Sequence, residues 1–293
     1  MISLMQQPKI EGYPDAYLFV RLRGKRVRVE QEESFSGSEP WGVLLDELRW
    51  VFATMRPGLR QKFAPCFLYF ELRNLQMILR SLAGGDRQQL ERIGRQSLLR
   101  SDLLRELLAC TGVAAALAIL DRYLELFVSD GLRLIESYEQ SGARAAEARL
   151  TDGLLPRMMQ LDLVAPVRDY LSGLIDLRNL LTAARYLRWE IDDPPLLTGD
   201  SGIGMQLRLA LKREGRAGLR TFLARQLPEA VDDPALLELE LLERFGRRWH
   251  RYRHDPLATG QIVDYLWQCY RRFRQAGLQR WGGQELAAWG GTG

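Results

Sequence analysis

The feature that most constrains the fold of this chain is a helical segment that occurs twice. Residues 71–85 read ELRNLQMILRSLAGG, and residues 176–190, which lie 105 positions later, read DLRNLLTAARYLRWE. An acid, Leu, Arg, Asn and Leu coincide in the same order. Both segments space their apolar residues as one face of an α-helix requires. We therefore expect the same helical unit to recur along the chain.

A third and weaker copy of this segment lies near the C-terminus. Residues 269–283 read CYRRFRQAGLQRWGG, with Cys269 in place of the acid and Arg272 in place of the asparagine. If the chain closes on itself, the three copies are 105, 93 and 95 residues apart. The spacing predicts three similar helical domains around a pseudo-threefold axis, and such closure would bring the N-terminal helix to the C-terminal end. The predicted domains are 1–100, 101–205 and 206–293.

Helical geometry assigns roles to the repeated positions. With about 100° of rotation per residue, the leucines of both segments fall on one stripe, which we expect to be buried. The acids and asparagines lie at the border of the stripe and are interpreted as clamps to a neighbouring helix; these are Glu71, Asn74, Asp176 and Asn179. The arginines point to the opposite side; these are Arg73, Arg80, Arg178 and Arg185. Ion pairs within the chain and contacts with a partner both remain open for them.

The rest of the sequence also favours an all-α fold. The chain is 46% hydrophobic and 27% charged, as is usual for a folded domain, and helical periodicity runs from about residue 41 onward. Asp233-Pro234 and Asp255-Pro256 have the residue pattern of helix starts. The segment Tyr17–Val29 alternates apolar and basic residues like a hairpin. Because no other strand-like segment could pair with a hairpin, we predict a helix there.

The charge balance limits the classes of partner. Lysine and arginine total 41 against 37 acids, so the net charge of +4 does not by itself indicate nucleic-acid binding. The stretch from Glu243 to Arg280 is more basic, and we predict that its arginines form a partner interface; these are Arg247, Arg248, Arg251, Arg271, Arg272 and Arg274. Aromatic residues between them could stack on bases, but Tyr270 and Phe273 have the spacing of a helix core.

Cysteines and apolar runs indicate the compartment. Cys66, Cys110 and Cys269 form no CxxC pair, which favours reduced thiols in the cytosol. The longest nearly apolar run, Leu107–Leu120, is 14 residues long, too short for a membrane span, and it predicts a buried helix. The first fifteen residues lack the pattern of a signal peptide. We expect a cytoplasmic protein.

Three motifs look catalytic but lack the context that catalysis requires. Gly199–Gly202 matches the sequence around a serine-protease nucleophile, yet both histidines follow it in a helical stretch. His250 and His254 are spaced i, i+4, but no acid lies between them as in HExxH. The pairs Asp192-Asp193 and Asp232-Asp233 precede prolines and are interpreted as helix caps. No catalytic residue, metal site or cofactor is predicted.

The order of these motifs resembles the C subunit of A-type and V-type rotary ATPases, which is the d subunit of vacuolar enzymes. Asp176–Arg185 (DLRNLLTAAR) resembles the middle Asp-x-x-Asn-x-x-x-x-x-Arg helix of that family, and Tyr17–Arg23 (YLFVRLR) resembles its opening helix. Pro256–Leu266 (PLATGQIVDYL) is similar to the segment that leads into the last motif helix. That last helix usually carries Glu-Ile-x-Asn-Leu, where this chain has CYRRF at 269–273.

The resemblance implies a fold and a role. Family members are all-α, funnel-shaped and built of three similar domains. They act without a catalytic site or cofactor between the central shaft and the rotor ring, on the cytoplasmic face of the membrane, which they reach only through the ring. It implies no small-molecule substrate, and it leaves the coupled ion and the direction of pumping open. The alternatives are an all-helical scaffold or adaptor and a basic nucleic-acid-binding protein.

Overall fold

The computed structural model describes residues 2–31, 40–125, 127, 131–197, 202–226, 233–254 and 258–282. The secondary-structure elements in these ranges are all helices, which confirms the all-α prediction. The chain divides into two compact units, and each takes two separate stretches of sequence. Unit 1 comprises Met1–Pro14 and Leu48–Val164; unit 2 comprises Asp15–Glu47 and Ala165–Gly293. The division falls within helix α2 (Pro40–Thr54).

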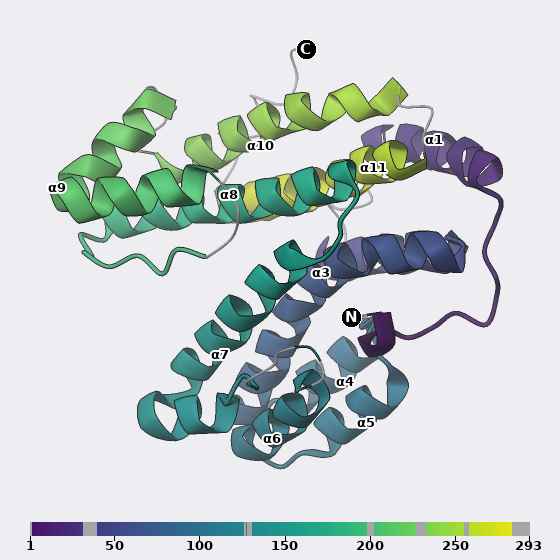
Figure 1. Ribbon diagram of the computed structural model, residues 1–293, viewed down its shortest axis with the longest axis horizontal. Coiled ribbons are helices and arrows are strands. Elements are labelled where there is room, and N and C mark those ends of the chain that lie inside the picture. The colour runs from purple at the N-terminus through teal and green to yellow at the C-terminus, as the bar shows by residue number, and fades with distance from the viewer. Residues whose placement is uncertain are drawn as a thin grey trace. The chain divides into compact units, whose positions relative to one another are not determined.

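Unit 1 is built on the long helix α3 (Pro57–Gly84), which carries the first motif (Figure 1). Proline occupies its first turn, and Gly85 ends it in the left-handed conformation with φ 71°, a backbone state that glycine adopts without a steric penalty. Around α3 lie α4 (Arg87–Gln96), α5 (Ser101–Ala109), α6 (Val113–Leu124) and α7 (Leu134–Gln160). The predicted leucine stripe of α3 is buried; its members are Leu72, Leu75, Leu79 and Leu82.

Unit 2 is built around α11 (Ala258–Gly282), which carries the third copy of the motif. Residues 261–269 of this helix are all buried, because α1 (Asp15–Gln31), α8 (Ala165–Arg188) and α10 (Pro234–His250) pack against it. Helix α9 (Gly202–Gln226) packs against α8 and bends at Gly215, whose φ is 56°; the short η2 (Arg251–His254) follows α10. An aromatic cluster fills the core, with the Trp249 and Trp267 ring centroids 4.4 Å apart.

Segments from the N-terminal part of the chain pack into both units. Helix α1 spans the segment in which helix and hairpin competed, so the helix prediction is confirmed. The Arg26 guanidinium on α1 pairs with Asp264 on α11 at 3.0 Å. In unit 1, η1 (Ile2–Leu4) leads into an antiparallel bridge between Met5 and Leu99. The first residues of the chain are therefore integral to the packing of each unit.

Two sequence predictions about local structure are wrong. The apolar run Leu107–Leu120 does not form one buried helix, because the backbone is extended at Cys110 and Gly112 and separates α5 from α6. Asp192 and Asp193 cap no helix; they lie in the loop after α8, and the paired prolines that follow them disfavour helical backbone. Asp233, in contrast, caps α10 by accepting bonds from the Ala235 and Leu236 amides.

No helix in the described ranges has both the length and the apolar character that crossing a bilayer requires.

Candidate functional site

The acid of the first motif is a buried side chain with a structural role. Glu71 on α3 is fully buried and accepts three hydrogen bonds: from the Leu98 amide at 2.8 Å, the Ser97 hydroxyl at 2.6 Å and Asn74 Nδ2 at 3.0 Å. Burial raises the pKa of Glu71, and the three donors oppose that shift. The pair Glu71 and Asn74 therefore fixes the turn between α4 and α5.

The second motif makes the same kind of connection through its asparagine. Asn179 on α8 is fully buried, donates from Nδ2 to the Leu197 carbonyl at 3.1 Å and accepts the Leu197 amide at 2.7 Å. Its side chain thus pairs with the backbone of Leu197 as a neighbouring strand would. Asp176, one turn before, is also buried. In both copies a buried side chain of the motif helix holds a loop that comes later in the chain.

These contacts correct the geometry expected from the helical wheel. The acid and asparagine of each motif lie within the core rather than at its border. The backbone groups that Glu71 and Asn179 bind belong to loop residues rather than to a neighbouring helix. A helical wheel misplaces these residues because it judges the burial of each position only by its angle from the leucine stripe. A polar group can lie deep in a core when backbone N–H and C=O groups satisfy it.

The motif arginines at the last equivalent position make ion pairs with buried acids. Arg80 on α3 binds Glu147 on α7 through two guanidinium nitrogens, at 3.0 and 2.6 Å. Arg185 on α8 lies 3.8 Å from Glu238 on α10, and Arg274 on α11 also pairs with Glu238. Arg80 and Arg185 therefore form ion pairs within the chain, which is one of the two roles that the sequence left open for them.

The other two motif arginines, Arg73 and Arg178, are exposed at equivalent positions of α3 and α8.

The third motif copy replaces this arrangement with a different polar cluster. Cys269 is fully buried, and burial raises the pKa of its thiol. One turn earlier, the Tyr265 hydroxyl donates to Glu47 at 2.6 Å, and Glu47 also binds Lys25 at 2.6 Å. The acid that α11 lacks at position 269 is thus supplied nearby from α2, and it ties the start of α2 and helix α1 to α11.

Several of the predicted partner arginines are already engaged within unit 2. Arg248 and Arg251 pair with Asp169 on α8, and the Tyr252 hydroxyl donates to the same carboxylate at 2.8 Å. Arg247 is exposed, whereas Arg271 and Arg272 are partly buried on α11.

The aromatic residues of this basic stretch are largely packed away from solvent. Trp249 and Trp267 are fully buried, Phe273 is 8% exposed and Tyr270 is half-buried. The faces that would stack on bases are therefore occupied by the core of unit 2, which weakens the nucleic-acid alternative.

The motifs that look catalytic are not assembled into a site within the described ranges. His250 is exposed at the end of α10 and His254 ends η2, while Ser201 and Asp232 lie outside the described residues. Among the residues that the structure describes, there is no group of three or more His, Cys, Asp or Glu side chains that could hold a metal ion.

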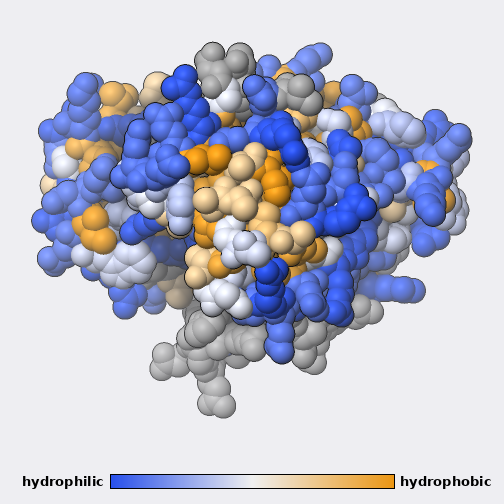
Figure 2. Space-filling model, turned by 90° about the horizontal axis from the view of Figure 1, so that it is seen from below, coloured by the Kyte–Doolittle hydropathy of each residue, from blue (hydrophilic) through white to orange (hydrophobic). Residues whose placement is uncertain are grey.

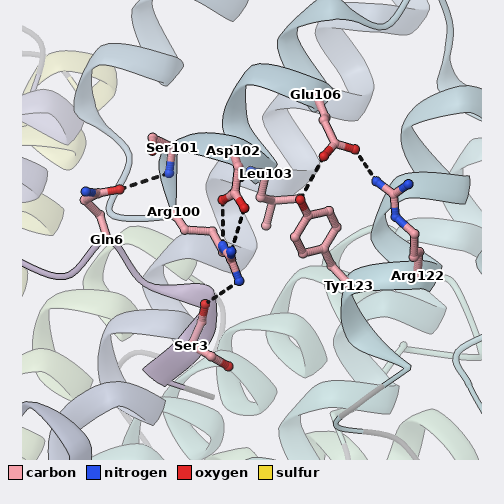
Figure 3. Close-up of polar contacts among 9 residues, drawn as sticks. All are labelled: Ser3, Gln6, Arg100, Ser101, Asp102, Leu103, Glu106, Arg122 and Tyr123. Atoms are coloured by element: carbon pink, nitrogen blue, oxygen red, sulfur yellow. Dashed lines mark hydrogen bonds and ion pairs between the residues drawn. The ribbon is translucent and has the colours of Figure 1, made fainter.

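A polar cluster at the start of α5 holds the N-terminal segment (Figure 3). The Arg100 guanidinium donates to Asp102 at 2.6 Å and to the Ser3 carbonyl at 3.3 Å. The Ser101 amide donates to the Gln6 side chain at 2.9 Å. The pairing lowers the pKa of Asp102. These groups satisfy one another and secure residues 3–6 against α5.

The same close-up shows Glu106 joining α5 to α6. The Tyr123 hydroxyl donates to Glu106 at 2.8 Å, and Arg122 pairs with the other oxygen of that carboxylate. The hydrogen bond to Glu106 raises the pKa of Tyr123. The C-terminal end of α6 is thereby tied to α5.

One face of α6 remains apolar and uncovered. Ala114, Ala115 and Ala118 are exposed along its first turns, and we call them the α6 alanine face. Figure 2 shows an apolar patch ringed by hydrophilic atoms on the side of unit 1 where α6 lies. A contiguous exposed apolar patch of this kind is typical of a surface that binds another protein.

Sequence reasoning missed several buried charges that organise the helices. Arg60 is 3% exposed and donates to the carbonyls of Phe52 and Ile10, and burial lowers its pKa. Glu238 could have been found, because Leu242 and Phe245 follow it at i+4 and i+7 and place it on an apolar stripe. No comparable signal marks Arg60, whose partners are backbone carbonyls.

No protein-family model matches this sequence, and a comparison with curated proteins finds no relative.

Proposed function

We propose that this protein is a non-catalytic central-stalk subunit of an A-type or V-type rotary ATPase, which couples the rotating shaft to the membrane-embedded rotor ring. The observation that carries the proposal is the repetition of one device in two motif helices. In α3 and α8, a buried Glu71 or Asn179 holds a later loop, and Arg80 or Arg185 pairs with a buried acid. A torque-transmitting body needs such internally braced helices.

The finer architecture belongs to the same proposal. We expect three similar helical repeats around a pseudo-threefold axis, with α11 as the motif helix of the third repeat and an overall funnel shape. The packing of α1 against α11 supports closure, because it brings the start of the chain to its end. The polar cluster of Tyr265, Glu47 and Lys25 would replace the missing third clamp.

Two surfaces suit the proposed partners. The α6 alanine face offers an apolar contact, and the exposed Arg247 together with its arginine neighbours offers a basic one. We expect the shaft and ring subunits to bind here, with the protein peripheral on the cytoplasmic face of the membrane.

Pull-down from detergent-solubilised membranes of the native host tests the proposal. We expect the tagged chain to recover ring and nucleotide-binding subunits, and Ala118→Arg to lose them without loss of helical content. Ala217→Arg, the same change at an exposed alanine on α9, is the matched control and should retain them. Recovery of other proteins without any rotor subunit would refute the proposal and favour a helical adaptor.

A further inference from the structure

Helix α1 has two apolar sides, and only one of them is covered within unit 2. Leu18, Leu22 and Val29 are buried on the side that packs against α11. A surface helix normally shows one apolar side and one polar side. The second apolar side therefore needs an explanation.

The uncovered side carries Tyr17, Val20, Gly24 and Val27, which we call the outer stripe of α1. Tyr17 is 45% exposed, Val20 68% and Val27 46%. Their spacing of i, i+3, i+7 and i+10 places them on one line along the helix. A single exposed valine is ordinary, but a continuous stripe is typical of an interface.

The described charged side chains of α1 that flank the outer stripe are basic. Arg21, Arg23 and Arg28 are exposed on its two flanks. Arg21 also donates to the Tyr17 hydroxyl at 3.2 Å, which orients the ring along the helix. Asp15 is the acid among the described side chains of α1, and it is half-buried on the side away from the stripe. The complementary surface is apolar with negative flanks.

Gly24 favours a helix as the occupant. It lies in the middle of the stripe, and a Cβ built there would meet no atom within 4 Å. Helices pack with their axes about 8–10 Å apart, and small residues at the crossing point set the short end of that range. A bilayer surface is a poorer match, because helices that lie on membranes carry Trp, Phe and Leu on the apolar side.

We propose that the outer stripe of α1 is a docking site for an amphipathic α-helix of a partner protein, with acidic residues on both flanks of its apolar face. The proposal does not depend on the rotary-ATPase assignment, since it rests on α1 alone. Three arginines would face the acidic flanks, and Gly24 would receive the closest turn of the bound helix.

A synthetic helix tests this with the full-length chain. The probe is a stapled peptide of about 20 residues, long enough to cover the roughly 25 Å of α1, with Leu and Ala on one face and Glu on its flanks. A second peptide has Lys in place of Glu. Binding is measured by fluorescence anisotropy at low and high salt. Helical content, measured by circular dichroism, confirms that each variant is folded.

We expect the Glu peptide to bind and the Lys peptide not to bind, with Gly24→Leu and Val20→Glu each weakening binding about tenfold or more. Leu209→Glu, at an exposed residue of α9, is the control and should bind normally. The double variant Arg23→Glu/Arg28→Glu should reverse the preference and bind the Lys peptide.

Three results would overturn the proposal. They are equal binding of both peptides, binding that Gly24→Leu leaves unchanged, and an absence of peptide binding. In the last case, sedimentation with vesicles of phosphatidylcholine and phosphatidylglycerol, or a Val20-dependent dimer in light scattering, would identify a membrane or a second copy as the occupant instead.

Discussion

Glu71 illustrates how a carboxylate can serve the fold rather than chemistry. It is fully buried, and each of its hydrogen bonds comes from a group that also lies in the core. Removing one partner of such a set leaves buried donors unsatisfied, which costs more than the bonds themselves contribute. Stability is therefore the property on which changes at this residue should act.

Glu71→Ala should lower the free energy of unfolding by about 3 kcal/mol, because the Leu98 amide and Asn74 lose their acceptor inside the core. Urea denaturation followed by circular dichroism measures this. Glu91→Ala, on the exposed side of α4, should change stability by less than about 0.5 kcal/mol. Equal effects of the two substitutions would contradict the role assigned to Glu71.

The pH dependence of stability provides a second test at this residue. The pKa of Glu71 is raised above its ordinary value of 4.5, so the folded state holds the proton more tightly than the unfolded chain. Its contribution is complete below pH 4.5 and is lost as the pH rises through the folded pKa. The stability of the natural chain relative to Glu71→Gln should therefore fall from pH 4.5 upward. A relative stability that increases with pH would mean a lowered pKa.

The sequence identified these residues but not their environment. The repeat marked Glu71, Asn74, Asp176 and Asn179 as polar positions beside a leucine stripe, and they are indeed structural. The backbone partners of Glu71 and Asn179, which are Leu98 and Leu197, lie in loops that show no helical periodicity. A backbone amide has no sequence signature, so the pairing could be seen only in three dimensions.

At the scale of elements, the contact between α1 and α11 contains a buried ion pair beside the buried Leu18 and Leu22. Asp264 is 2% exposed, and burial raises its pKa while Arg26 opposes the shift. Arg26→Met leaves this carboxylate without its cation and should cost about 3–5 kcal/mol at neutral pH. The loss should diminish as the pH falls, because protonation of Asp264 removes the unpaired charge.

The double variant Arg26→Met/Asp264→Leu is the decisive comparison, since two apolar side chains can replace a buried pair at little cost. Urea midpoints of the single and double variants complete a double-mutant cycle. If the double variant is as unstable as Arg26→Met alone, helix packing rather than the ion pair holds α1.

Helix starts and breaks show where local sequence patterns fail to predict an element. Asp233 predicted its helix start correctly, because the capping side chain and the proline act within one turn. Asp193 precedes Pro194 in the same way, yet Pro195 after Pro194 disfavours a helix, and the neighbouring Asp192 pairs with Arg216 on α9. The break at Gly112 was hidden by the apolar residues on both sides of it. Local signals are decisive only where no neighbouring residue opposes them.

In the whole molecule, the two units are built from interleaved stretches of sequence, and this determines which fragments can fold alone. The chain passes from unit 1 to unit 2 at Pro14, returns within α2, and enters unit 2 again after Val164. The three-way division at residues 100 and 205, which follows sequence order, stays a prediction. Each unit is completed by a segment far away in sequence, as Arg60 binding the Ile10 carbonyl shows in unit 1.

A fragment of residues 165–293 should therefore not fold stably, because α11 would expose to water the side that α1 covers. Joining residues 15–47 after Gly293 through a flexible Gly/Ser linker should restore cooperative thermal unfolding, since α1 and the start of α2 return with Arg26, Lys25 and Glu47. Circular dichroism and calorimetry compare the two chains. The same joined chain with Leu18→Asp and Leu22→Asp is the control, and it should behave like the short fragment because both leucines are buried. Cooperative unfolding of 165–293 alone would show that α1 is dispensable for unit 2, and the closure of the chain through α1 and α11 would lose its energetic basis.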